Sequence, residues 1–496
     1  MRRLSASHKR NSRKPRETYK KKGIEYIRDQ KKILQLTYME NLSAQIPAWN
    51  VYKKIAFRFS FILFILFIIL LDYNNTIFSW LIFYFGQFRK PLDIVIFWIG
   101  KHIFHISYTI VSPAIDEQHN DRTYIYLLYF TIAAVAVTGA VVWSALDRKR
   151  TNYTTLYYWF TAILRYYLAF TLFVFAMEKF FKMQFPDLGY YRLTEPLGDM
   201  SPMGLAWAFF GYSEGYNYFI GIAEAAALFL LFRRTMTFGA ILTLATLANV
   251  AVVNYNYDIH AKMYPAALLV ITIFLLLNDA KRVFKFFFTG QANPLPVIQA
   301  PVFKKRWQKI SKAMLKFLVI GIHIILIVVV YWNAKKHREE TYKVHSGFYG
   351  VYDVTAYIVN KDTLSNENPL RWNQLVIGDM IEGVRFKGDS IAFADVSIDK
   401  KEILLSGDQT DLYRKMQEIY NENGNYHYPN VDSILIARQI KSRIVFELSG
   451  SNTLKLRGKI KNDSVFITAK RSPLEIKNFR LMKRHSHWIN EASYIY

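Results

Sequence analysis

Residues 156–178 read LYYWFTAILRYYLAFTLFVFAME, and this run decides the class of fold. Arg165 is the only charged residue before Glu178 in this run. A run of about 20 mostly apolar residues is long enough to cross the hydrocarbon core of a bilayer as an α-helix. The chain is therefore predicted to be a polytopic α-helical membrane protein.

Comparable apolar runs on both sides of this one raise the prediction to about seven transmembrane helices. The other six predicted spans are 55–71, 124–143, 216–232, 236–253, 263–278 and 316–332. Residues 76–105 are also apolar, but Arg89, Lys90 and Pro91 interrupt them. This segment is predicted to be either one interfacial helix or two half-insertions, and the sequence leaves open whether it spans the membrane or lies at the interface.

The distribution of charge predicts the orientation of the spans. The net charge is +26, and the chain contains no cysteine, which excludes disulfides and thiolate metal sites. Residues 1–54 carry fifteen Lys/Arg and four acids, and residues 279–315 carry eight Lys/Arg and one acid. Because cytoplasmic connections collect Lys and Arg, both segments are predicted to lie in the cytoplasm. The predicted location is the bacterial inner membrane, with the N-terminus cytoplasmic and the C-terminal domain periplasmic.

Residues 333–496 differ from the rest of the chain in their pattern. Runs such as RIVFEL (443–448) alternate polar and apolar side chains, which is typical of half-buried strands. We therefore expect a C-terminal, antiparallel β-rich soluble domain, either a sandwich or a small barrel. The predicted division is 1–54 basic arm, 55–123 first helix with an external segment, 124–285 helical membrane core, 286–315 basic loop, 316–332 last helix and 333–496 external β-rich domain.

Glu224 stands inside the predicted fourth span, in GIAEAAALFLLFRRT (221–235). Charged side chains at this depth usually face protein or water and have partners. If residues 216–232 form one helix, Glu224 lies about 12 Å from its cytoplasmic end, at a depth similar to that of Arg165 on the third span. We therefore predict an intramembrane polar pocket formed by Arg165, Glu224 and Asn249, in which the Arg165–Glu224 pair serves either as structural contact or as ligand site.

A second group of polar residues is expected at the external ends of the helices. Glu178 and Lys179 end the third span, and a short polar turn joins the fifth span to the sixth. The candidate external pocket comprises Glu178, Lys179, Asn254, Asp258, His260 and Lys262. The alternative is that these are ordinary polar residues at headgroup level. No metal site is predicted.

Four segments together resemble the DoxX-like membrane family, in the long form with a C-terminal soluble domain known from Bacteroidota. They are RYYLAFTLFVFAMEKFFKMQFP (165–186), GDMSPMGLAWAFFGYS (198–213), GIAEAAALFLLFRRTMTFGA (221–240) and NVAVVNYNYDIHAKMY (249–264). The resemblance implies that Lys179, Glu224, Asn249, Asp258 and Lys262 are the family-like positions. His260 departs from the family pattern, which has a proline there. A more distant similarity is to the vitamin-K-dependent carboxylase-like membrane family.

The DoxX-like resemblance implies a subunit or accessory factor of a membrane complex that is redox- or quinone-linked, with a quinone-like lipid as the cofactor it would hold. Two alternatives stay open: a non-enzymatic scaffold whose external β-domain binds envelope partners, and a proton-coupled transporter of small solutes. The expected partners are the bilayer and membrane or periplasmic proteins, and no nucleic acid. The β-rich domain has no recognisable catalytic constellation in its sequence, so no enzyme is assigned.

Overall fold

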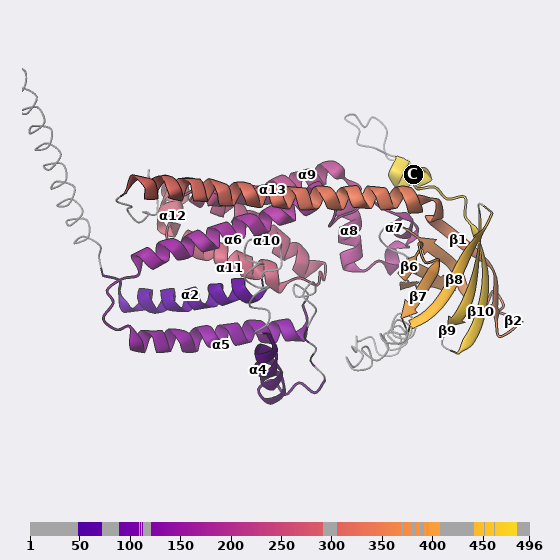
Figure 1. Ribbon diagram of the computed structural model, residues 1–496, viewed down its shortest axis with the longest axis horizontal. Helices are drawn as coiled ribbons and strands as arrows, with labels where there is room; N and C mark the ends of the chain where they lie inside the picture. The colour runs from indigo at the N-terminus through magenta and orange to yellow at the C-terminus, as the bar shows by residue number, and fades with distance from the viewer. Residues whose placement is uncertain are drawn as a thin grey trace, which may run out of the picture.

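The fold was analysed in a computed structural model (Figure 1). It describes residues 48–71, 89–108, 110, 112, 121–290, 305–368, 371–378, 383–386, 391–393, 395–406, 441–450, 452–460 and 462–483. Most of the predicted basic arm 1–54 and the first half of segment 76–105 lie outside the described residues, as does much of the basic loop 286–315.

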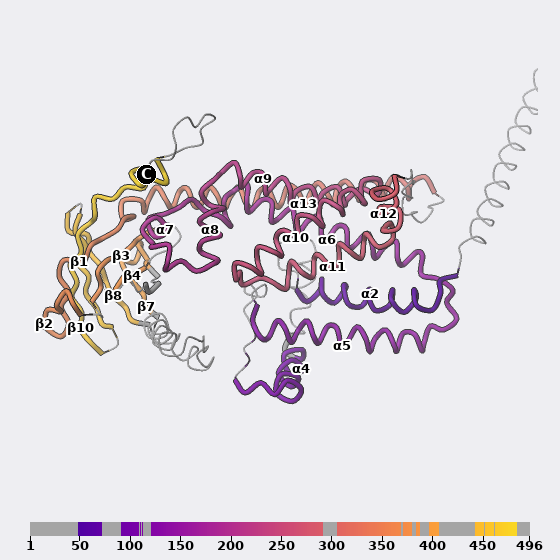
Figure 2. The backbone as a smooth tube through the Cα atoms, turned by 180° about the vertical axis from the view of Figure 1, so that it is seen from behind, coloured from indigo at the N-terminus to yellow at the C-terminus, as the bar shows by residue number. Residues whose placement is uncertain are grey.

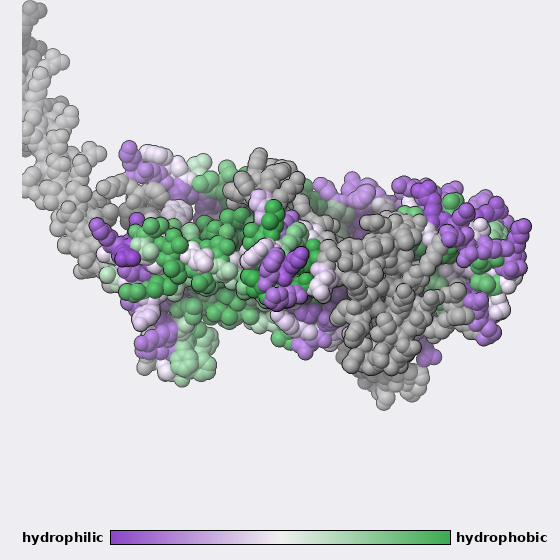
Figure 3. All heavy atoms as spheres, turned by 90° about the horizontal axis from the view of Figure 1, so that it is seen from below, coloured by the Kyte–Doolittle hydropathy of each residue, from purple (hydrophilic) through white to green (hydrophobic). Residues whose placement is uncertain are grey.

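Five helices of the described chain are long and apolar enough to cross a membrane. They are α2 (Val51–Leu71), α5 (Thr123–Leu146), α6 (Thr154–Phe180), α10 (Met236–Asn256) and α13 (Arg306–His345). They run along the long axis of the molecule, and α6 is the most buried of them (Figure 1). The apolar residues cover the helical part on the face seen in Figure 3 and are bordered by polar side chains, which fits a membrane-embedded bundle.

The predicted count of seven spans is not confirmed. The sixth predicted span is α11 (Met263–Leu277), which is followed by α12 (Ala280–Thr289) at a bend of 79° and counts as a crossing only as part of that bent pair. The fourth predicted span, 216–232, is divided into the 12-residue helix α9 (Glu214–Ala225) and the 3-10 helix η4 (Ala226–Leu231). At about 1.5 Å per residue α9 is only about 18 Å long, so it cannot cross the apolar core by itself.

The described part of segment 76–105 contains α4 (Arg89–His102), which runs across the direction of α5 (Figures 1 and 2). Ile96 and Ile99 are buried, whereas Trp98 and Ile94 on the other face are exposed. The hydroxyl of Tyr124 donates a hydrogen bond to Asp93 and so ties α4 to the start of α5. The described half of this segment is thus one 14-residue helix, which is too short to cross the apolar core by itself.

The last long helix extends beyond the predicted span 316–332. α13 continues to His345, because its polar extension forms i, i+4 ion pairs between Lys335 and Glu339 and between Lys336 and Glu340. The β-domain therefore begins at Gly350 rather than near residue 333. In Figure 1 this single helix connects the bundle to the β-domain.

The β-domain is one curved antiparallel sheet, which confirms the predicted antiparallel β-rich domain. In the described residues this sheet forms a half-barrel rather than the expected sandwich or small barrel. The strand order is β5-β4-β3-β1-β10-β9-β8-β7-β6, and β2 (Asp362–Thr363) pairs with β1 off this path. The strands are β1 (Gly350–Val359), β3 (Trp372–Ile377), β4 (Gly383–Phe386), β5 (Ile391–Phe393), β6 (Asp395–Ser397), β7 (Glu402–Ser406), β8 (Lys441–Ser449), β9 (Thr453–Ile460) and β10 (Asp463–Arg471). Tyr352, Trp372 and Phe446 are the largest buried side chains of its core.

Three short elements lie between the bundle and the half-barrel (Figures 1 and 2). They are α7 (Tyr190–Thr194), the 3-10 helix η3 (Leu197–Asp199) and α8 (Pro202–Tyr212). Ser201 caps α8, since its hydroxyl accepts a hydrogen bond from the amide of Gly204. These elements form the connection between α6 and α9 and bring that connection against the β-domain.

Candidate functional site

A buried ion pair lies where the C-terminal end of α6 meets α9. Lys179 Nζ is 3.0 Å from Glu224 Oε1, and the two side chains are only 5% and 2% exposed. The helices approach closely at this level because Gly221 has no side chain: a Cβ there would lie 2.6 Å from the ring of Phe180. The small residue and the ion pair thus occupy the same helix contact, one turn apart along α9.

The surroundings of this pair are apolar on the lysine side and rich in hydrogen-bond acceptors on the other. Lys179 Nζ lies 5.3 Å from the ring centre of Phe175 and 5.8 Å from that of Phe185, within the range of cation–π attraction. Among the described residues, three buried oxygens of α9 and of the turn after α6 have no hydrogen-bond donor: Glu224 Oε2, Asn217 Oδ1 and Gln184 Oε1. Asn217 lies two turns before Glu224 on the same buried face of α9.

Glu178, next to Lys179 in the sequence, is oriented to another helix. It accepts a hydrogen bond of 3.2 Å from the hydroxyl of Tyr331 on α13. The two neighbouring charges at the end of α6 therefore bind two different partners, α9 through Lys179 and α13 through Glu178. Together they fix the end of α6 between these helices.

The predicted pair between Arg165 and Glu224 is wrong, because Glu224 pairs with Lys179. The depth estimate placed the turn after the fourth span level with the start of α6. The structure instead brings this turn to the middle of α6, because Arg165 Nη1 lies 3.8 Å from the sulfur of Met236 at the start of α10. Glu224 therefore lies farther along α6, beside Lys179.

Asn249 is also absent from this cluster. It lies on the exposed face of α10, so the predicted pocket of Arg165, Glu224 and Asn249 does not form. Thr243 and Leu247 are buried and belong to the stripe of α10 that faces the bundle. Asn249 lies outside this stripe at the helical period of 3.6 residues, which explains why it does not join the pocket.

The external polar turn between α10 and α11 is a separate structure. Asn254 Nδ2 donates to the carbonyl of Ala261, and Lys262 Nζ lies 2.8 Å from Asp258 Oδ1. This hydrogen bond lowers the pKa of the Asp258 carboxyl, and His260 is exposed. No hydrogen bond or ion pair joins this turn to Glu178 or Lys179, all of which are described, so the predicted external pocket consists of two unconnected groups.

Asp121, which the sequence analysis did not single out, organises this turn. Its carboxylate accepts hydrogen bonds from the amides of Lys262 and Met263 and lies 3.6 Å from Lys262 Nζ. It thereby caps the start of α11 from a position that is 141 residues away in sequence. Local sequence patterns contain no signal for such a contact.

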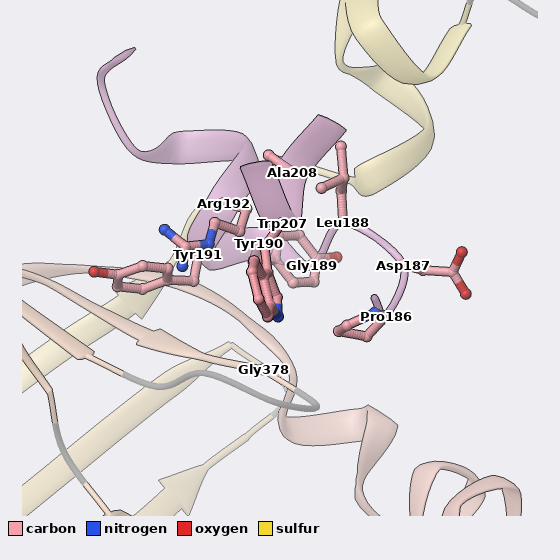
Figure 4. Close-up of a pocket in the computed structure, with 10 residues that line it drawn as sticks. All are labelled: Pro186, Asp187, Leu188, Gly189, Tyr190, Tyr191, Arg192, Trp207, Ala208 and Gly378. Atoms are coloured by element: carbon pink, nitrogen blue, oxygen red, sulfur yellow. The ribbon is translucent and has the colours of Figure 1, made fainter. Parts of the chain in front are cut away.

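A small cavity of about 60 Å³ lies between the connection that follows α6 and the β-domain (Figure 4). It is lined by residues 186–192, Trp207, Ala208 and Gly378. The rings of Trp207 and Phe185 pack with their centres 5.1 Å apart, and Lys179 Nζ lies 5.8 Å from the ring centre of Phe185. Phe185 therefore contacts both a residue that lines this cavity and the lysine of the ion pair.

The β-domain covers the same connection. Tyr191 of α7 packs against Val351 and Val376 of the sheet, and Arg385 of β4 donates a hydrogen bond of 2.8 Å to the hydroxyl of Thr194. A polar hollow of about 430 Å³ lies on the sheet next to this contact, with Asp353, Arg371 and Gln374 among its lining residues. The sequence analysis did not identify this hollow.

Replacing Arg385 with alanine is expected to loosen this contact. Arg385 is 8% exposed, and the loss of a hydrogen bond from a charged donor costs about 1.5–3 kcal/mol. Hydrogen–deuterium exchange should become faster in 190–194 and 372–377 and stay unchanged in the matched variant Lys455→Ala, an exposed cation of β9. Equal exchange in R385A and wild-type protein would show that the contact does not hold the β-domain in place.

Fold and site together define a membrane-embedded helical protein with a β half-barrel attached by its last long helix. No protein-family model matches the chain, and no solved structure matches it. Over 147 residues, 29% of this chain and 89% of the relative, the chain is 33% identical to YwoB, an uncharacterised protein of Bacillus subtilis (strain 168). The chain therefore belongs to the same family as YwoB.

Proposed function

We propose that the protein is a binding subunit of a membrane complex and that it binds a quinol-like lipid at the Lys179–Glu224 pair. The observation that carries the proposal is the state of Glu224: one carboxylate oxygen is paired with Lys179, and the other is buried without a protein donor. A buried acceptor of this kind is costly unless a ligand or water satisfies it.

The chemistry of a quinol fits these atoms. Its hydroxyl groups would donate to Glu224 Oε2, and the flat apolar ring would pack beside Phe175 and Phe185, which already flank the lysine. The amide oxygens of Asn217 and Gln184 provide further acceptors in the same region. A ligand reaching the pair from the cavity in Figure 4 would have to displace the ring of Phe185.

The proposal includes membership in the DoxX-like family and the orientation with the β half-barrel in the periplasm. The connection between α5 and α6, with Arg148, Lys149 and Arg150, supports this orientation. It lies at the end of the bundle opposite the β-domain, as does the start of α13 (Figure 1). The Lys/Arg excess of these connections is typical of the cytoplasmic side.

A second candidate function is a scaffold whose β-domain binds envelope proteins. The polar hollow beside Arg385 favours it, since it presents charged and amide groups on the outer domain. No comparable observation on the described residues favours the transporter alternative. Glu224, the residue that a transport path would have to reach, is only 1% exposed. Deleting 350–483 should abolish the role of a scaffold, while the double variant K179M/E224Q should leave that role intact.

The quinol proposal is tested by lipid analysis of the full-length protein purified from its native membrane. We expect quinone or quinol to co-purify with the wild type and with Glu214→Gln, an exposed glutamate at the start of the same helix. We expect it to be lost from the double variant K179M/E224Q. Quinone-free wild-type protein, or equal quinone in a folded K179M/E224Q protein, would contradict the proposal.

A further inference from the structure

Four cationic side chains come together at the end of the bundle that is opposite the β-domain. We call them the cationic cluster: Arg165 of α6, Arg233 of the turn after η4, and Lys312 and Lys316 of α13. They come from three separate parts of the chain, so no local sequence motif reveals them. The start of α13, which carries the two lysines, is at the left end in Figure 1.

Lys316 is held at the centre of the cluster by two contacts. Its Nζ donates a hydrogen bond of 2.9 Å to the carbonyl of Leu231 and lies 4.5 Å from the ring centre of Phe232. One turn earlier on α13, Lys312 Nζ lies 5.3 Å from the ring centre of Tyr158 on α6. The two lysines therefore face α6 and the end of η4 rather than the surrounding lipid.

Arg165 forms the buried floor of the cluster. It is 4% exposed, Nη1 contacts only the weak acceptor sulfur of Met236 at 3.8 Å, and Nε has no protein acceptor. A buried guanidinium normally has carboxylate, phosphate or carbonyl oxygens as acceptors, because its desolvation is otherwise uncompensated. Arg165 thus has hydrogen-bonding capacity that the described protein does not fill.

The charges of the cluster repel one another. The charged groups that act on Lys316 are Arg165, Arg233 and Lys312, all of them cations, and the charged group that acts on Arg165 is Arg233. Positive charge around Arg165 and Lys316 in a partly apolar surrounding raises the free energy of the fold, and an anion bound to these two side chains reverses the sign of that contribution. The arrangement is therefore complementary to an anion.

We propose that the cationic cluster binds the phosphate headgroup of an anionic phospholipid. Arg165 and Lys316 donate hydrogen bonds to the phosphate oxygens, and Arg233 and Lys312 neutralise its charge. A lipid is favoured over a free phosphate because the exposed apolar side chains Met314, Phe317 and Leu318 flank the two lysines on α13. These side chains provide a surface for the acyl chains beside the headgroup.

The test is a titration of the full-length protein, purified in a neutral detergent, with dioleoylphosphatidylglycerol. Lipid retention is followed by native mass spectrometry, and the Tm by scanning fluorimetry. We expect retention of the anionic lipid and a rise in Tm, and neither effect from dioleoylphosphatidylcholine. Inorganic phosphate at the same concentration is expected to have no effect, and a Tm rise of equal size with phosphate would overturn the assignment to a lipid.

Single substitutions test which side chains bind the phosphatidylglycerol headgroup. Lys316→Gln and Lys312→Gln should each weaken phosphatidylglycerol binding about fivefold, since one cation near a headgroup contributes about 1 kcal/mol. Arg165→Gln should weaken it more, whereas Arg165→Lys should retain part of the affinity. Lys335→Gln, with the same charge change on the distant end of α13, is the control. Wild-type affinity in both K316Q and K312Q would overturn the proposal even if R165Q does not fold.

Discussion

Replacing Glu224 with glutamine should destabilise the protein by about 3–5 kcal/mol, because it leaves the buried ammonium of Lys179 without its counter-charge. The two side chains are 5% and 2% exposed, so water cannot take over the role of the carboxylate without opening the contact between α6 and α9. The effect is measured as a fall in Tm of the purified protein in detergent.

The double variant K179M/E224Q separates the ion pair from the general packing of this region. Replacing both members of a buried pair by uncharged groups of similar size is often close to neutral. We therefore expect K179M/E224Q to recover most of the stability lost in E224Q, and E214Q to behave like the wild type. Additive losses in the double variant would show that the two residues do not stabilise the protein as a pair.

The second large effect is expected for Arg58→Met at the other end of the bundle. Arg58 of α2 is 4% exposed and donates hydrogen bonds to Tyr153, to Ser144 and to the carbonyl of Asp147, at 2.7–2.9 Å. These bonds join α2 to α5 and to the start of α6. Loss of several charge-assisted hydrogen bonds, with buried acceptors left behind, should cost about 3 kcal/mol.

The effect of Arg58→Met is measured as the Tm of the purified variant, and the control is the Tm of Lys53→Met. Lys53 lies one turn earlier on α2, where it is exposed and contacts the ring of Trp49 at 4.6 Å. We expect K53M to shift the Tm little. If R58M and K53M have the same Tm, the hydrogen bonds of Arg58 do not contribute to the stability of the bundle.

The helical bundle and the β-domain could be predicted because each rests on a periodic pattern. Apolar runs of span length predicted α2, α5, α6, α10 and α13, and strict alternation predicted strands such as β8 and β10. The fourth span is not confirmed as one continuous α-helix, because residues 226–231 are apolar but form a 3-10 helix, a difference that hydropathy does not record.

The candidate site could be predicted only in part. Lys179 and Glu224 were both identified, but their pairing depends on the relative depth of α6 and α9, and the turn before α10 lies level with Arg165 rather than with the start of α6. The contacts of Asp121 with the start of α11 and of Arg385 with Thr194 join residues more than a hundred positions apart. Such contacts depend on how the elements pack, and a single sequence holds no periodic signal for them.

The most direct test of the ligand-binding account is the affinity of the purified protein, in lipid nanodiscs, for the soluble quinol menadiol. The account predicts saturable binding to the wild type and to E214Q, and binding weaker by about 10- to 100-fold in folded K179M/E224Q, the cost of losing a hydrogen bond to a charged group. The same affinity in wild type and K179M/E224Q would contradict it.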